Sequence, residues 1–132
     1  MKKSNQLPPL SDSQLEIMNV IWGRGACTVT DVVEELNAHR PVARNTVLTL
    51  MTRLADKGWL IQEKSGRSHL FTASREKQTV QQSMVRRLLQ AAFGGNPDGL
   101  IMAMVDDGAL SAEDLDAIRK RIDDASAGGD RK

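Results

Sequence analysis

A row of side chains that could read DNA repeats at helical spacing near the middle of the chain: Asn45, Leu48, Thr49 and Thr52. Short amide and hydroxyl groups form hydrogen bonds with base edges, whereas long acidic side chains would repel phosphate. A helix that faced only water would more often carry Lys and Glu on this side. The row therefore indicates a helix that lies in the major groove of DNA.

Basic residues around this row extend the predicted contact surface. Arg40 and Arg44 flank the start of the helix, where the helix dipole attracts phosphate. Lys64 and Arg67 belong to a basic turn that suits phosphate or the minor groove, although a solvated hairpin tip has the same composition. The predicted DNA-binding residues are Arg40, Arg44, Asn45, Thr46, Leu48, Thr49, Thr52, Arg53, Lys64 and Arg67. Leu48 has two interpretations: contact with a thymine methyl group, or a tolerated exposed leucine.

Signals of catalysis are missing from the sequence. There is no phosphate-binding glycine loop, no His-Glu-x-x-His motif and no pair of carboxylates around a histidine. The histidines, His39 and His69, belong to different predicted elements, and the single cysteine, Cys27, lies far from His69 in sequence. Exposed structural histidines are therefore favoured over a metal site, and we expect no enzyme and no cofactor.

The elements that must position this row form a winged helix-turn-helix. Their predicted order is helix, edge strand, helix, helix, strand, wing, strand. In the third helix Val47, Leu50, Met51 and Leu54 form the buried face, opposite the polar row. The other expected elements are a first helix capped by Ser11 and Gln14, a bridge near Cys27, a helix at Thr30–Ala38, strands at Trp59–Lys64 and Ser68–Ala73, and a turn at Ser65–Arg67.

Three further helices follow the hairpin. Ser74 is a candidate cap for a helix from about Arg75 to Phe93. The segment Leu100–Val105 is apolar on every side, so a short helix there must be enclosed. Ser111 opens a last helix with a narrow apolar seam.

These helices are too few to bury their own apolar faces, which favours a symmetric partner over a monomer whose helices fold back. The predicted dimerisation residues are Met84, Val85, Leu88, Leu89, Leu100, Ile101, Met104, Leu115, Ile118 and Ile122. The fold class is thus mainly α with a small β-hairpin: an N-terminal winged helix-turn-helix and a C-terminal helical dimerisation domain. The predicted organisation is a flexible arm (1–10), a DNA-binding domain (11–74), a dimerisation domain (75–125) and a disordered tail (126–132).

The charge distribution agrees with DNA contact by the front of the chain. The chain has 132 residues and a net charge of +1. Residues 1–75 hold 10 basic against 7 acidic residues, whereas residues 76–132 hold 8 against 10, although surface scatter could produce this difference. With no membrane span and no signal peptide in the sequence, we expect a cytoplasmic protein without membrane insertion.

The motifs that carry a family resemblance are LSDSQLEIMNVIW at the start and VARNTVLTLMTRLADKGWL through the third helix. Two further motifs belong to this set: FGG after the fourth helix, and LSAEDLDAIRKRI near the end. Over Leu10 to about Ala125 the chain resembles the penicillinase-repressor family of BlaI/MecI/CopY-type transcriptional regulators.

The resemblance implies a homodimeric winged-helix repressor that binds an inverted repeat in double-stranded promoter DNA. Carried over by position, it puts Arg44, Asn45, Thr46 and Thr49 at the DNA. Members often carry a basic or amide residue where this chain has Leu48, so its operator preference is expected to differ. The copper-responsive branch has a C-terminal cysteine cluster that this chain lacks.

In the β-lactam branch, a membrane sensor-protease system triggers a cut between Asn and Phe in the helix that matches Leu100–Val105. The matching pair here is Ala103–Met104. The sequence thus predicts a dimeric repressor that occludes a promoter and is released by signal-induced proteolysis. Two alternatives stay open: an effector-binding winged-helix regulator with a ligand pocket lined by Leu100–Val105, and a winged-helix module that binds protein.

Overall fold

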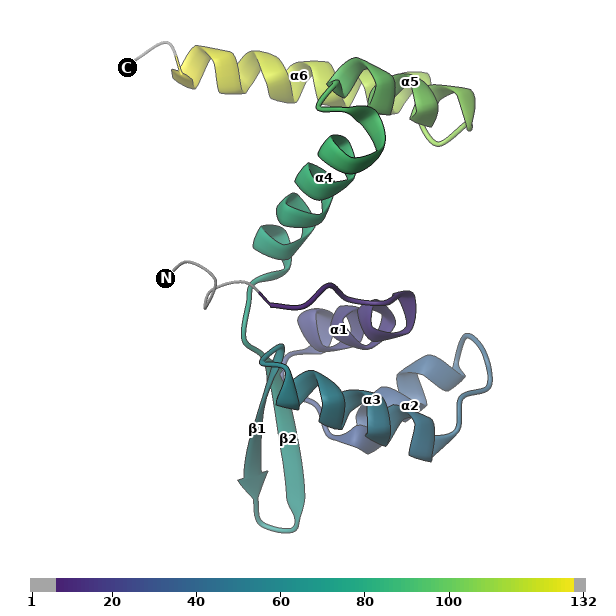
Figure 1. Ribbon diagram of the computed structural model, residues 1–132, viewed down its shortest axis with the longest axis vertical. Coiled ribbons are helices and arrows are strands. Elements are labelled where there is room, and N and C mark those ends of the chain that lie inside the picture. Colours follow the sequence, from purple (N-terminus) through teal and green to yellow (C-terminus); the bar gives the residue numbers. More distant parts are fainter. Residues whose placement is uncertain (1–6, 130–132) are drawn as a thin grey trace. The chain divides into compact units, whose positions relative to one another are not determined.

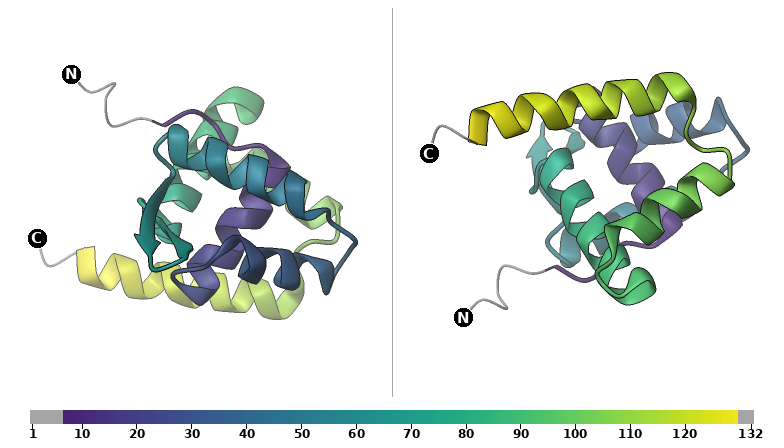
Figure 2. Two further views of the ribbon diagram at one scale, coloured as in Figure 1. Left: turned by 90° about the horizontal axis from the view of Figure 1, so that it is seen from below. Right: turned by 90° about the horizontal axis from the view of Figure 1, so that it is seen from above.

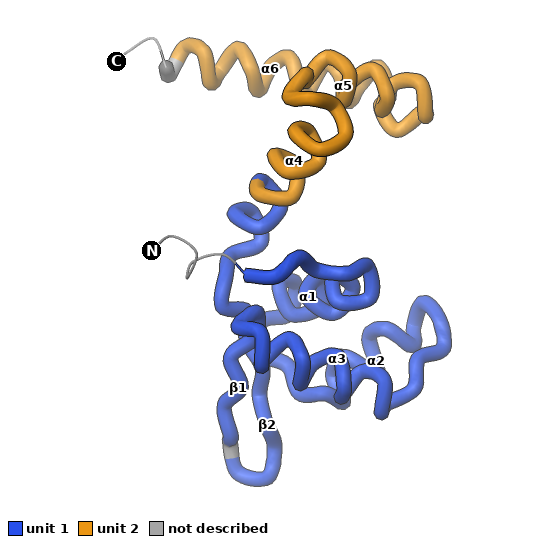
Figure 3. The backbone as a smooth tube through the Cα atoms, in the orientation of Figure 1, with its two compact units in different colours: residues 1–82 blue, residues 83–132 orange. Residues whose placement is uncertain are grey.

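The computed structural model describes residues 7–129, which form six helices and one two-stranded antiparallel sheet. The chain divides into two compact units, residues 1–82 and 83–132 (Figure 3). The division falls inside α4 (Lys77–Phe93), whereas the sequence placed the boundary between residues 74 and 75.

Three helices and a hairpin make up the first unit, in the order that the sequence predicted. Its elements are α1 (Asp12–Arg24), α2 (Val29–Asn37), α3 (Arg44–Asp56), β1 (Leu60–Ser65) and β2 (Ser68–Ala73). The three helices contact one another, and the hairpin lies next to α3 and α1 (Figures 1 and 2). The predicted winged helix-turn-helix is confirmed.

An aliphatic core joins the three helices to the hairpin and fixes the orientation of α3. Val47, Met51 and Leu54 are fully buried, and Leu50 is half-buried, as the helical spacing predicted. Each such side chain stabilises the fold by about 1.5–3 kcal/mol, so rotating α3 about its axis would be costly. The remaining core residues are Ile17, Met18, Val20, Ile21, Cys27, Val29, Val32, Leu36, Trp59, Leu60, Phe71 and Val80.

Reciprocal caps define the starts of the first two helices. The Ser11 hydroxyl accepts from the Gln14 amide and the Gln14 side chain accepts from Ser11, which confirms the predicted capping box. Thr28 and Asp31 form the same arrangement at α2, and the bonds from Thr28 lower the pKa of Asp31. Such caps satisfy N–H groups that a helix start leaves unpaired.

The wing is a tight hairpin whose strands pair from Leu60 with Ala73 to Ser65 with Ser68. The turn is therefore Gly66-Arg67, one residue shorter than predicted, and Gly66 has φ +63°. Only glycine adopts such a left-handed angle without a steric penalty, so Gly66 permits this short turn.

The predicted bridge at Cys27 is present as an isolated pairing with Phe71. The Cys27 amide donates to the Phe71 carbonyl at 3.0 Å, and the Phe71 amide donates back at 2.8 Å. Because the thiol is enclosed in the core, burial raises the pKa of Cys27.

The predicted cap at Ser74 is wrong, because its hydroxyl is used elsewhere. It donates to the carbonyls of Gly58 and Trp59, across the base of the hairpin, and α4 begins only at Lys77. The Trp22 indole donates to the Arg75 carbonyl at 2.9 Å in the same region. These bonds anchor the segment that leads into α4.

The segment before α1 is held on the domain as far as the structure describes it. Leu7 and Leu10 pack against the core, and the Trp59 indole donates to the Pro8 carbonyl at 2.9 Å. The predicted flexible arm is therefore corrected for Leu7–Leu10, and residues 1–6 lie outside the described residues.

The second unit contains the rest of α4 together with α5 (Pro97–Asp106) and α6 (Ala112–Gly129). Asn96 caps α5, and Ser111 and Asp114 cap α6 reciprocally. Helix α6 passes Ser126, where the sequence predicted a tail, because Ala125-Ser126-Ala127 tolerates helix. Residues 130–132 of that tail lie outside the described residues.

None of the residues of this unit whose exposure is described, 83–127, is buried. The prediction that Leu100–Val105 is enclosed is wrong for the single chain, where Met102 is 54% exposed. Separately, no helix among the described residues is long and apolar enough to cross a membrane.

Candidate nucleic-acid interface

Helix α3 presents its predicted polar row to solvent. Asn45, Thr49 and Thr52 are exposed, and Leu48 lies among them at 45% exposure. Thr46 and Arg53 are exposed at the margins of the row. The segment Arg44–Arg53 contains no acidic residue, so nothing on this face of the helix itself repels phosphate.

The start of α3 differs chemically from the starts of α1 and α2. Its N-cap residue, Ala43, has no side-chain hydrogen bond, and the first turn contains no acidic residue. No carboxylate of its own first turn therefore offsets the positive end of the helix dipole. Arg44 stands at this end and donates to the Thr30 hydroxyl at 2.8 Å, which positions its guanidinium between α2 and α3.

Asn37 organises the turn between α2 and α3, a role that the sequence analysis missed. Its Oδ1 accepts from the Val42 amide at 2.9 Å, and its Nδ2 donates to the Val33 carbonyl at 2.9 Å and to the Val42 carbonyl at 3.3 Å. One side chain thus ties the last turn of α2 to the residues just before α3. An Asn that ends a helical run was the available signal.

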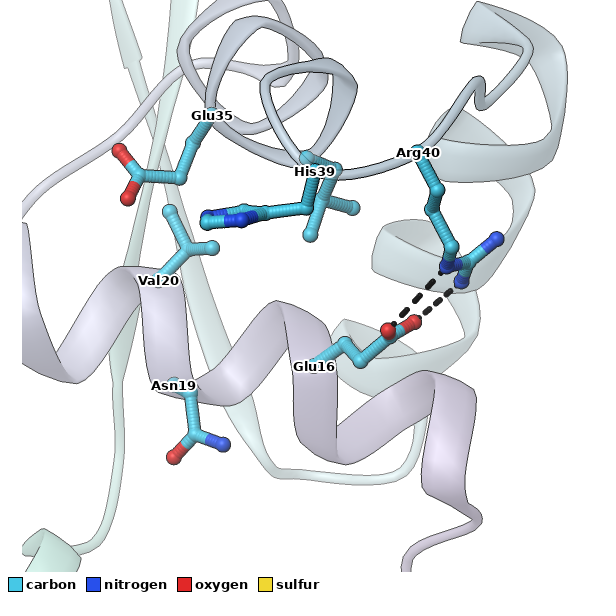
Figure 4. A pocket seen from close by; sticks show the side chains of 7 residues that line it. Glu16, Asn19, Val20, Glu35, His39 and Arg40 are labelled. Atoms are coloured by element: carbon cyan, nitrogen blue, oxygen red, sulfur yellow. Dashed lines mark hydrogen bonds and ion pairs between the residues drawn. The ribbon is translucent and has the colours of Figure 1, made fainter.

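Arg40 is engaged by α1 instead of standing free beside α3. Its guanidinium donates to both carboxylate oxygens of Glu16 (Figure 4). These hydrogen bonds lower the pKa of Glu16 and raise the pKa of Arg40. The predicted phosphate contact of Arg40 would have to compete with this pair, whereas Arg44 has no such ion pair among the described contacts.

The predicted wing residues, Lys64 and Arg67, are both exposed. Arg67 occupies the turn itself, and Lys64 pairs across the sheet with His69. His69 shares a hydrogen bond of 2.9 Å with Gln62. Lys64 and Arg67 are the Lys and Arg residues of the hairpin.

A pocket of about 260 Å³ lies between α1 and the end of α2. Its lining includes Glu16, Asn19, Glu35 and His39 (Figure 4). The lining contains no residue of Leu100–Val105, so this pocket is not the one that the effector-binding alternative requires. Within residues 7–129, no three His, Cys, Asp or Glu side chains are grouped so that they could hold a metal ion.

Known proteins resemble this chain over nearly its whole length. Residues 10–124 match the family model described as penicillinase repressor. The penicillinase repressor of Staphylococcus aureus is 22% identical over 123 residues, which cover 93% of this chain and 98% of that protein. The transcriptional regulator BlaI of Mycobacterium tuberculosis is 30% identical over 125 residues, which cover 93% of this chain and 89% of that protein.

Solved structures resemble the fold. The solution structure of the DNA-binding domain of the repressor BlaI has 32% identity and a TM-score of 0.50, and the match covers 55% of this chain and 88% of that one. The transcriptional regulator Tm0710 of Thermotoga maritima has 19% identity and a TM-score of 0.52, and the match covers 92% of this chain and 77% of that one. The second likeness concerns the fold alone.

Proposed function

The chain belongs to the penicillinase repressor family, whose members are transcriptional repressors and not enzymes, and from this premise we propose that it binds an inverted-repeat operator as a homodimer. Each protomer places α3 in the major groove of one half-site, and the bound dimer blocks access of polymerase to the promoter. Two-fold symmetry sets the half-sites about one helical turn, ~34 Å, or a multiple of it, apart.

The observation that carries this proposal is the exposed face of α3. Its hydrogen-bonding side chains, Asn45, Thr49 and Thr52, are turned outward by a buried opposite face. The start of the helix carries Arg44 and no acidic group, while Lys64 and Arg67 supply positive charge on the wing. This distribution suits phosphate contacts at the edges of the surface and base contacts at its centre.

Dimerisation is supported by the apolar surface of the second unit. Met84, Val85 and Leu88 are each more than 40% exposed on α4. Leu115, Ile118 and Ile122 form an exposed seam on α6, and Ile122 reaches 58% exposure. A unit with no buried side chain among its described residues would not hold its helices together in water, but a second copy could cover these faces. Leu89, Leu100, Ile101 and Met104 remain the other proposed dimer contacts.

Release of the repressor from the operator is proposed to act through α5. Gly94 and Gly95 before this helix and Gly108 after it have positive φ, so the helix ends at both sides. Its residue Ala103 is exposed and Met104 is half-buried, which makes the bond between them a candidate for a protease or for local unfolding. Loss of α6 would then weaken dimerisation and, with it, operator binding.

The experiment combines sedimentation with DNA binding. At micromolar concentration the wild-type chain should sediment at twice the 14.5 kDa of one protomer. It should shift an inverted repeat more strongly than a single half-site, and the affinity should fall steeply with salt. A chain that sediments at the mass of one protomer would refute the dimer, and equal affinity for operator and random DNA would refute the repressor.

Ile118→Asp tests the proposed seam directly. The substitution buries a charge in the dimer interface, costs several kcal/mol, and should give monomers. Lys120→Asp is the matched control, because helical spacing puts the same acid on the opposite side of α6. If both variants stay dimeric, the seam lies outside the interface.

A further inference from the structure

We infer that Leu48 reads the methyl group of a thymine in each half-site, which makes it a specificity-determining residue of this chain. The inference rests on the proposed function, since it assumes that α3 enters the major groove. It adds a particular base preference to that function.

The position of Leu48 is central in the exposed row. It lies three residues after Asn45 and four before Thr52, so these polar side chains are its neighbours on the helix surface. Leu48 is 45% exposed, whereas Leu54 on the opposite face is fully buried. Leu48 belongs neither to the buried core nor to the partly buried hydrophobic residues that pack against it.

The chemistry of a leucine limits what it can contact in the groove. The side chain has no donor, no acceptor and no charge, so it can bind neither phosphate nor the polar edge of a base. The apolar group that unmodified DNA displays in the major groove is the C5 methyl of thymine. A leucine held at the centre of the surface therefore favours thymine and disfavours cytosine, whose amino group would lose water without gaining a partner.

The size of the effect follows from the area covered. Burial of one methyl-sized group is worth about 0.8 kcal/mol, which corresponds to about fourfold in affinity. A dimer that reads the same thymine in both half-sites should lose about 15-fold when both methyl groups are removed, because well-separated positions add.

The experiment uses the full chain and a DNA duplex that this chain selects from a random library. Each thymine of the selected duplex is replaced in turn by uracil, which lacks only the methyl group, in one half-site and then in both. For the wild type we expect one position per half-site at which the replacement lowers affinity about fourfold, or about 15-fold in both. For Leu48→Ala, we expect lower affinity for the thymine duplex and no further loss with uracil.

The variant should fold, because the position is exposed and alanine is a strong helix former. Ile61→Ala is the matched control: Ile61 is an aliphatic residue of β1 with 51% exposure, and its removal should leave the sensitivity to uracil unchanged. Methyl sensitivity that persists in Leu48→Ala, or a wild type insensitive to uracil at every position, would overturn the inference and leave the proposed repressor standing. A wild-type chain that enriches no sequence would overturn both.

Discussion

At the scale of single residues, Asn45 is the side chain best suited to direct recognition of a base. Its exposed amide can pair bidentately with adenine, and such a pair discriminates by about 1–3 kcal/mol. Asn45→Ala, alone or with Thr49→Ala, should lower affinity for the operator about 5- to 150-fold for each half-site and leave affinity for random DNA nearly unchanged. Competition gel shifts against both DNAs measure this ratio, and an equal loss on both would remove Asn45 from base readout.

Arg67 is expected to act differently, because it is a cation at the tip of the wing. Arg67→Ala should weaken binding to operator and random DNA alike, and it should lower the slope of log affinity against log salt by about one for each bound protomer. Arg67→Lys retains the charge and is the matched control for the slope. An unchanged slope in Arg67→Ala would place the wing away from the phosphates.

Residue spacing predicted both faces of α3, because Val47, Met51 and Leu54 recur at the 3.6-residue period of a helix. It could not reveal that Arg40 pairs with Glu16, since that contact joins residues 24 apart in sequence. The same holds for Ser74, whose hydroxyl bonds to Gly58 and Trp59 only after the hairpin has formed. The local sequence pattern thus predicts which face of a helix a residue lies on, but it does not predict a hydrogen-bond partner that is distant in sequence.

At the scale of elements, the angle at which α3 leaves the turn depends on Asn37. Asn37→Ala removes the acceptor of the Val42 amide and the donor to Val33, which should lower the free energy of unfolding by about 1 kcal/mol. Operator affinity should fall as well, because the start of α3 is less firmly held. Urea unfolding and gel shifts measure the two effects.

Two controls separate this role from a general surface effect. Asn37→Asp keeps the acceptor for Val42 and should lie between the wild type and Asn37→Ala. Asn19→Ala removes an exposed amide from α1 and should leave operator binding unchanged. If Asn37→Ala matches the wild type in stability and binding, other contacts hold the turn.

The elements of the second unit show where prediction from sequence stops. The capping residue Ser111 marked the start of α6 well, because a cap acts within four residues. The surroundings of Leu100–Val105 were not predictable in the same way. A segment that is apolar on all sides requires a cover, but its sequence does not say whether the cover comes from the same chain or from another copy.

At the scale of the whole molecule, we propose that the first unit contacts DNA and the second dimerises, and a single truncation should separate these two functions. The described core lies between Ile17 and Val80, so a chain that ends at Ala103 keeps all of it and should fold in its first unit. The same cut removes α6 with its seam and the end of α5. The truncated chain should therefore be largely monomeric and should bind the inverted-repeat operator about 10²- to 10⁴-fold more weakly, because linkage of the two half-sites is lost.

Binding to a single half-site separates this explanation from simple damage to the first unit. The truncated and full chains should bind an isolated half-site with similar affinity, since α3 and the wing are unchanged in both. Sedimentation and near-ultraviolet circular dichroism of Trp22 and Trp59 report the mass and the fold of the first unit. A truncated chain that still dimerises and binds the full operator as tightly as the intact chain would place the switch outside α5 and α6, and a ligand-responsive release would then become the better explanation.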